Sequence, residues 1–409
     1  MDTSYLLLAA KYIRRQAKQL AEQLDGVCKA EDIEFVHRAR VASRRLRAAL
    51  RMFRHCFGGK SVKKWRKQIR RVTSELGDAR DIDVQIEFLC GAMHSVTQPA
   101  CYPGIARLLV QLEHRRGLLQ TSVIKAVGRL RTGGALDEMQ AVAKKILSDP
   151  NSDQMSVQSL AARRETGQHI RRRLKEMLRH QESLGDPQDQ ARHHAMRIAA
   201  KRLRYSLEIA GPVYDKQLDP MIEAVKKVQS LLGEVHDCDV WLERLEAFAA
   251  SERENVLALF GSAGPFGRLS VGIEYLRQDR ASHCQQAFQE LVAYWAELKR
   301  QRLWENLLNV MGEPAEIAEA AAEITADTAG PGKLPVPAAA SMAAAPLPTA
   351  TELAPHWHKV GNVEVREEPA YGLRPKLEPV REPPRQPVSE LPRQTRIILP
   401  SAAVQTVQP

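Results

Sequence analysis

Internal repetition constrains the fold of this chain more than any other feature of its sequence. Residues 37–50 match residues 194–207 without a gap, at an offset of 157 positions, and both begin His-x-x-Arg-x-x-x-(Arg/Lys)-Arg-Leu-Arg. Residues 76–84 match residues 232–240 at an offset of 156, and both read Leu-Gly-(Asp/Glu)-x-x-Asp-x-Asp-Val. These matches predict a duplicated unit, with repeat one over residues 1–160 and repeat two over residues 161–310.

Helical periodicity runs through both repeats. Apolar residues recur every three or four positions, for example from Ser4 to Leu24, whereas few segments alternate with the period of two that a strand requires. Each repeat has room for about four helices of ordinary length. The sequence therefore predicts an all-α fold of two tandem four-helix bundles.

The C-terminal part differs sharply in composition. Of the 23 prolines in the chain, 16 lie in residues 313–409, which are also rich in alanine and show no apolar periodicity. Such a segment cannot form helices that bury a core. We predict a disordered Pro/Ala-rich tail over residues 311–409, whose partner the sequence does not identify; Ile397-Ile398-Leu399 is a candidate docking motif within it.

Charge points to a polyanionic partner. The net charge is +11, and residues 1–312 carry 51 Lys or Arg against 37 Asp or Glu. Nucleic acid, polyphosphate and an anionic membrane surface are the partner classes that this balance favours. The apolar run Tyr5–Ala10 is too short to span a membrane, and six cysteines without metal-ligand spacing indicate reduced thiols. We expect a cytoplasmic protein.

The repeated segment carries a cationic stripe. On a helical wheel its basic residues share one sector and its apolar residues lie opposite. No Asp or Glu occurs between Arg38 and Arg54, so the mutual repulsion of the cations favours a bound anion over a merely solvated face. Arg38 and Arg45 point away from this sector. The predicted ligands of the anion are His37, Arg40, Arg44, Arg47, Arg51, His194, Arg197, Lys201 and Arg204.

Basic residues on neighbouring helices are candidates for secondary contacts with the same anion. They are Arg14, Lys18, Lys67, Arg71, Arg171, Lys175, Lys226 and Lys227. Arginine offers fixed pairs of donors to phosphate oxygens, and lysine offers a mobile point charge. His37 and His194 can donate from both ring nitrogens when protonated, and a nearby polyanion would raise the pKa of each.

The acidic segments 78–83 and 234–239 are interpreted as turns after a helix that ends near Leu76 or its counterpart. Their carboxylates are expected to cap a helix or to orient arginines, with a bound Mg²⁺ or Ca²⁺ as the alternative. We predict no cofactor. Gly58-Gly59-Lys60-Ser61 lacks the first glycine and the preceding strand of a phosphate-binding loop, and no catalytic triad is evident.

Together, the two His/Arg segments and the two Leu-Gly-(Asp/Glu) segments resemble those of the conserved histidine α-helical domain (CHAD) family over about residues 4–308. The resemblance implies two four-helix bundles related by a pseudo-two-fold axis, whose His/Arg helices line a shared basic surface or pore. It also implies binding of inorganic polyphosphate and association with polyphosphate granules. Many members carry an adjoining triphosphate-tunnel domain; no such stretch occurs here, so we expect no self-contained triphosphatase activity.

The sequence thus predicts a non-enzymatic polyphosphate-binding protein. A nucleic-acid-binding protein is the first alternative, although aromatic residues make up only 5% of the chain and hardly interleave with the basic stripe. The second alternative is an accessory domain for phosphoryl transfer or phosphate-ester hydrolysis in which His37 or His194 accepts a phosphoryl group.

Overall fold

The computed structural model describes residues 3–149 and 156–312, and within these residues every regular element is helical. The first half contains α1 (Thr3–Lys29), α2 (Ile33–Met52), α3 (Gly59–Ser95), α4 (Tyr102–Thr132) and α5 (Ala135–Leu147). The second half contains α6 (Leu160–Leu178), α7 (Gln190–Ala210), α8 (Asp219–Phe260), α9 (Gly267–Arg300) and α10 (Leu303–Met311). The all-α prediction is confirmed. The predicted tail beyond residue 312, with its Ile397-Ile398-Leu399 motif, lies outside the described residues.

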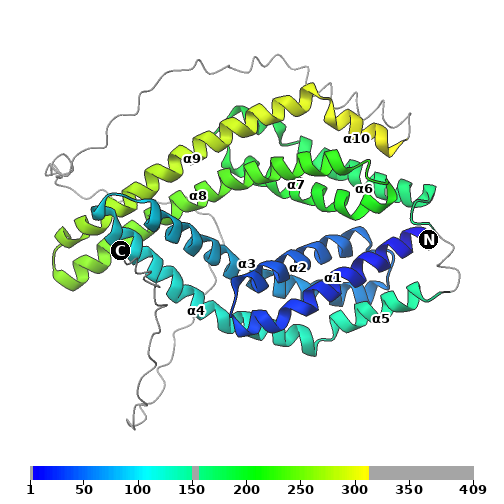
Figure 1. Ribbon diagram of the computed structural model, residues 1–409, viewed down its shortest axis with the longest axis horizontal. Helices are drawn as coiled ribbons and strands as arrows, with labels where there is room; N and C mark the ends of the chain where they lie inside the picture. Colours follow the sequence, from blue (N-terminus) through cyan, green and yellow to red (C-terminus); the bar gives the residue numbers. More distant parts are fainter. Residues whose placement is uncertain (1–2, 150–155, 313–409) are drawn as a thin grey trace, which may run out of the picture. The chain divides into compact units, whose positions relative to one another are not determined.

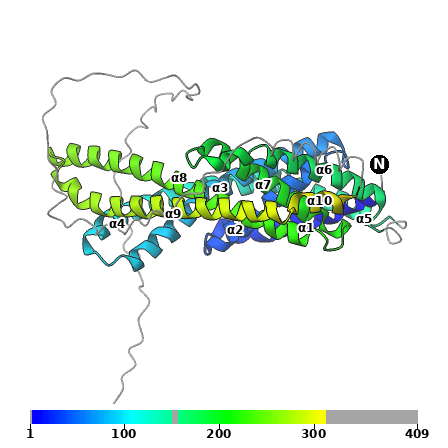
Figure 2. The ribbon, with the colours of Figure 1, turned by 90° about the horizontal axis from the view of Figure 1, so that it is seen from above.

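Helices of the two halves correspond one to one. They follow the same order, and equivalent helices contact each other across the halves: α1 with α6, α2 with α7, and α4 with α9. Contact between equivalent surfaces is what a pseudo-two-fold relation produces. Each half has five α-helices within the described residues rather than about four, because α5 packs along α1 and α10 packs on α6 and α9. The α3–α4 and α8–α9 hairpins extend toward the same end, away from α5 and α10 (Figures 1 and 2).

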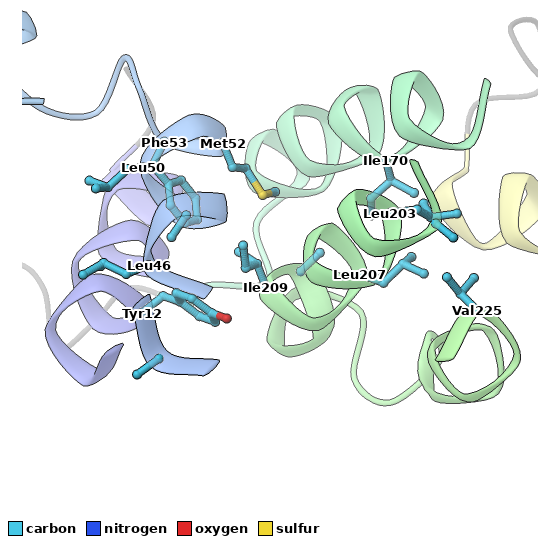
Figure 3. Packing of buried hydrophobic residues seen from close by; sticks show 14 of the residues in the cluster. Tyr12, Leu46, Leu50, Met52, Phe53, Ile170, Leu203, Leu207, Ile209 and Val225 are labelled. Atoms are coloured by element: carbon cyan, nitrogen blue, oxygen red, sulfur yellow. The ribbon is translucent and has the colours of Figure 1, made fainter. Parts of the chain in front are cut away.

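The repeated sequence forms α2 and α7, and local chemistry starts both helices alike. The Asp32 carboxylate accepts a hydrogen bond from the backbone N–H of Glu34 at 2.8 Å, and the Asp189 carboxylate accepts one from that of Arg192 at 3.2 Å. These are N-cap bonds, which satisfy donors that the first helical turn leaves free. The apolar faces, including Leu46 and Leu203, are fully buried in one continuous core (Figure 3).

A second core joins the far halves of the long hairpins. It contains buried side chains of α3, α4, α8 and α9, such as Leu89, Trp241 and Leu276. Here α4 and α9 cross at two glycines: a Cβ built on Gly104 would lie 2.1 Å from the carbonyl oxygen of Leu269, and one on Gly272 would lie 2.1 Å from that of Cys101. Only glycine allows the two backbones to approach this closely.

The interpretation of residues 78–83 and 234–239 as turns was wrong. Both segments lie inside helices, because α3 runs unbroken to Ser95 and α8 to Phe260. Leu76, Ala79 and Ile82 keep the helical spacing and are buried, so packing along this face outweighs the roughly 1 kcal/mol that an interior glycine such as Gly77 costs. Carboxylates at these positions cannot cap a helix end.

None of the described helices is long and apolar enough to cross a membrane.

All six cysteines lie within the described residues and carry free thiols.

Candidate functional site

Where α2 meets α7, the two basic stripes converge on one group of cations, which we call the central cluster: Arg40, Arg44, Arg197, Lys201 and Arg204. Each of these residues belongs to the stripe predicted from sequence, and their side chains are only partly exposed. The contact between α2 and α7 sets the two stripes against each other. Both repeats therefore contribute cations to one group.

Burial and like charge act together on the central cluster. They lower the pKa of Lys201 to about 7; burial is the largest cause, and the repulsion of Arg44 and of Arg197 comes next. Burial also lowers the pKa of Arg44 and of Arg197, although a guanidinium remains charged at neutral pH. An anion bound here would relieve the repulsion.

Carboxylates hold some of these cations in place. An Asp81 oxygen accepts a hydrogen bond from Nη2 of Arg40 at 3.1 Å, and Arg204 lies 3.5 Å from the Glu208 carboxylate. Asp83, two residues beyond Asp81, is buried and pairs with Arg116 at 2.6 Å. Of the roles expected for the acidic segment, orienting arginines is therefore the one that the structure contains.

The two stripe histidines have different surroundings. Nδ1 of His194 lies 3.2 Å from Nδ1 of His236, and the ring centres are 4.4 Å apart. Burial, followed by the charges of Arg197 and Lys201, lowers the pKa of His194, and burial lowers that of His236 to about 4. His37 is exposed. The lowered pKa of each ring favours its neutral form, and a nearby polyanion would favour the cationic form expected of His194.

Repeat one continues the cationic surface into a groove between α2 and α3, which we call the α2–α3 groove. Its volume is about 1250 Å³. None of its eight Arg and Lys side chains forms an ion pair with a carboxylate of the described residues, and Glu75 is the acid in its lining. The eight are Arg47, Arg51, Arg54, Lys63, Arg66, Lys67, Arg70 and Arg71.

A smaller cavity connects this groove with the central cluster. Its volume is about 360 Å³, and it lies between α2, α6 and α7. It is lined by Arg44 and Lys201, which belong to the central cluster, and by Arg47 and Arg51, which also line the groove. Arg51 also lines a third cavity, of about 440 Å³, together with basic residues of α6. The lining residues are therefore continuous from the central cluster to the groove.

The secondary candidates separate into three sets. Lys67 and Arg71 line the α2–α3 groove, whereas Arg14, Lys18, Arg171 and Lys175 line none of the three cavities. Two further candidates are paired with acids, as Lys226 lies 3.2 Å from Glu223 and Lys227 lies 3.3 Å from Glu290. Arg38 and Arg45, which the sequence placed outside the stripe, line none of these cavities and pair with Glu34 and Glu208. Glu208 also lies beside Arg204 of the central cluster.

Several residues that line the site or face its histidines were not predicted from the sequence. Arg66 and Arg70 line the groove beside Lys67 and Arg71, and their spacing of four residues could have placed them on one helical face. His236 belongs to the acidic segment of repeat two, which gave no sign that it would face His194. Arg173 of α6 lines the connecting cavity, and only the packing of α6 against α7 brings it there.

These observations define a class of protein: a duplicated all-α fold in which the two equivalent basic helices meet at a cationic cleft. The family model of the CHAD domain matches residues 11–246. The chain belongs to the CHAD domain family.

Individual relatives share this region at low identity. An uncharacterized protein of Mycobacterium tuberculosis strain CDC 1551, MT2285, is 27% identical over 253 residues, and so is the uncharacterized protein Rv2226 of strain H37Rv. The match covers 58% of this chain and 46% of each relative, so the chain matches less than half the length of these proteins.

Two solved structures are also similar. The crystal structure of the CHAD domain from the plant Ricinus communis aligns with 20% identity and a TM-score of 0.46, covering 78% of this chain and 91% of that one. PptA from Streptomyces chartreusis aligns with 18% identity and a TM-score of 0.42, covering 69% and 98%.

Proposed function

We propose that this protein binds inorganic polyphosphate without turning it over. The observation that carries the proposal is the continuous cationic lining from the central cluster to the α2–α3 groove, whose eight Arg and Lys side chains have no carboxylate partner among the described residues. Side chains left unpaired in this way are free to donate to phosphate oxygens.

The length of this surface favours an extended anion over a small one. Residues of α3 from Gly59 to Glu75 line the groove, which at about 1.5 Å per residue corresponds to roughly 24 Å of helix. A single phosphate would contact only a few of these cations. A polyphosphate chain carries a negative charge at every unit and can contact cations along the whole surface.

Nucleic acid is the second candidate, since its backbone is also a line of phosphates. Proteins that bind single strands without sequence preference offer aromatic rings on which bases stack. The lining of the α2–α3 groove contains no Phe, Tyr or Trp. Tyr205 in the connecting cavity is covered by the guanidinium of Arg204, 5.0 Å from the ring centre. The site therefore supports polyphosphate better.

The test is a titration of the full chain with long-chain polyphosphate, comparing the wild type with Arg47→Ala combined with Arg51→Ala. A charge-assisted hydrogen bond contributes roughly 1.5–3 kcal/mol. Because both side chains are at least partly exposed to water, we expect each loss at the low end of this range, about 3 kcal/mol in all, which is roughly a 150-fold loss of affinity. Folding should persist, since both arginines repel other cations. Arg300→Ala combined with Arg302→Ala removes two charges from side chains that are 76% and 77% exposed at and just beyond the end of α9, and it is the matched control.

Unchanged affinity in the double variant would contradict the assignment of the site. Displacement of polyphosphate by DNA or RNA at far lower phosphate concentration would favour the nucleic-acid alternative. Release of orthophosphate, or an acid-labile phosphoryl label on the protein, would show that a histidine takes part in phosphoryl transfer.

The proposal extends to the cell. A polyphosphate-binding protein is expected in the cytoplasm, on polyphosphate granules where these form. Imaging of the tagged protein in cells with and without polyphosphate tests this, and a distribution that does not respond to polyphosphate would count against it.

A further inference from the structure

We propose that a long polyphosphate chain leaves the central cluster over repeat one alone, along the α2–α3 groove and then across α3 into a cavity between α3 and α4. The inference rests on the proposed function and adds the path of the chain and its direction. We call this path the repeat-one track.

The cavity at the far end of the track lies between α3 and α4 and has a volume of about 560 Å³. It shares Arg71 and Glu75 with the α2–α3 groove, so the two spaces meet over α3. Lys125 and Arg129, one helical turn apart on α4, also line it. Both side chains are exposed, and neither forms an ion pair with a carboxylate of the described residues. An anion that leaves the groove at Arg71 thus meets further unpaired cations.

Within the described residues, several positions of repeat two that correspond to the track carry acids or paired lysines, although its backbone follows the same course. The counterpart of Arg51, at the offset of 157, is Glu208. This carboxylate lies 3.5 Å from Arg204 and 3.3 Å from Arg45, so it neutralises the end of the α7 stripe. The basic stripe of α2 runs on into a groove, and the stripe of α7 ends at an acid.

Along α8, as at the end of α7, acids replace basic residues of repeat one. At the offset of 156, Lys63 and Lys67 of α3 correspond to Asp219 and Glu223 of α8. The lysines that remain on α8 are Lys226 and Lys227. Both are held in ion pairs, by Glu223 and by Glu290, and Lys227 also lies 4.5 Å from the ring centre of Tyr294.

The asymmetry has a measurable consequence for chain length. A short anion such as tripolyphosphate can be held by the central cluster alone. A long chain must continue past it, and it gains contacts along the repeat-one track but meets carboxylates on the side of repeat two. The affinity for long chains should therefore depend on Lys125 and Arg129, which lie far along the track, and the affinity for tripolyphosphate should not.

The experiment compares the binding of tripolyphosphate and long-chain polyphosphate to the full chain. Lys125→Gln combined with Arg129→Gln removes two charges from the end of the track. We expect it to weaken binding of the long chain about tenfold and to leave binding of tripolyphosphate unchanged. Lys144→Gln combined with Lys145→Gln removes the same charge from exposed positions of α5 outside the cavities described, and it controls for net charge.

Three outcomes would overturn the track: unchanged affinity of the Lys125/Arg129 variant for the long chain, an equal loss for both anions, or an equal loss in the α5 control. If Lys226→Gln combined with Lys227→Gln weakened binding of the long chain as much as the Lys125/Arg129 variant does, the chain would not leave the central cluster over repeat one alone. Each of these outcomes presupposes that the wild type binds long-chain polyphosphate. Failure of the wild type to bind it, or its ready displacement by duplex DNA, would instead overturn the proposed function.

Discussion

The affinity for polyphosphate is predicted to depend on pH through the charge of Lys201. Its pKa is lowered to about 7 by burial and by the neighbouring arginines, so about half of the unliganded molecules carry the ammonium at pH 7. A polyanion in the central cluster favours the charged form and raises this pKa. Binding therefore takes up a proton at neutral pH, and the affinity must fall as the pH rises above the pKa of the free protein.

The magnitude follows from the same value. With a pKa of about 7 in the free protein, the protonated fraction of Lys201 falls from roughly 0.9 at pH 6 to roughly 0.09 at pH 8. If the anion binds only the protonated form, the affinity falls about tenfold over this range. Burial lowers the pKa of His236 to about 4 and also lowers that of His194, so both shifts move the rings away from the upper part of this range, where Lys201 titrates.

Titration with long-chain polyphosphate at pH 6, 7 and 8 and at fixed ionic strength tests the prediction, and Lys201→Arg is the informative variant. Repeat one already has arginine, Arg44, at the equivalent position, and a guanidinium stays charged throughout this range. The variant should bind at pH 8 nearly as tightly as at pH 6. A tenfold fall that persists in Lys201→Arg would refute the reasoning and assign the proton to another group, such as a stripe histidine. A flat profile in the wild type would show that the charge of Lys201 does not contribute to binding.

Three further predictions concern packing, a buried ion pair and salt. Gly104→Ala brings a methyl group against the carbonyl of Leu269, and chemical denaturation should show that the free energy of unfolding falls by about 2–3 kcal/mol. Gly117→Ala on the same helix has open space around it and should be neutral or slightly stabilising. Equal losses in the two variants would contradict the close crossing of α4 and α9. Arg116→Ala leaves the Asp83 carboxylate buried without its partner and should cost roughly 3–5 kcal/mol in the free energy of unfolding, whereas a loss below 1 kcal/mol would show that the carboxylate finds other partners. The logarithm of the affinity for polyphosphate should fall linearly with the logarithm of salt concentration, with a slope about 1–2 smaller for the double arginine variant of the α2–α3 groove than for the wild type; equal slopes would show that those arginines make no phosphate contacts.

The sequence was sufficient for features that depend on neighbours along one helix. The spacing of apolar residues identified α2 and α7, and the same spacing placed Arg40, Arg44 and Arg47 on the opposite, basic face. The match between repeats indicated that both helices belong to one arrangement. These inferences held because helical geometry fixes which residues share a face before any tertiary contact forms.

Sequence reasoning failed where a local signal was outweighed by packing. The glycine and the clustered acids near residue 78 are typical of a turn, yet the buried face of α3 continues through them. Only the contacts with α2 and α4 show that a helix through these residues is more stable than a turn.

The sequence also did not show which basic side chains form ion pairs with carboxylates. Counting basic residues treats Lys67 and Lys227 alike, but one lines a groove and the other is held by Glu290. Whether a cation is free depends on which helices pack side by side and bring a carboxylate within reach. The sequence by itself determined the duplicated helical fold and the two basic stripes, because both follow from periodicity. The tertiary structure decided which of the basic side chains in the described residues are paired with carboxylates, because the partners of a side chain come from distant parts of the chain.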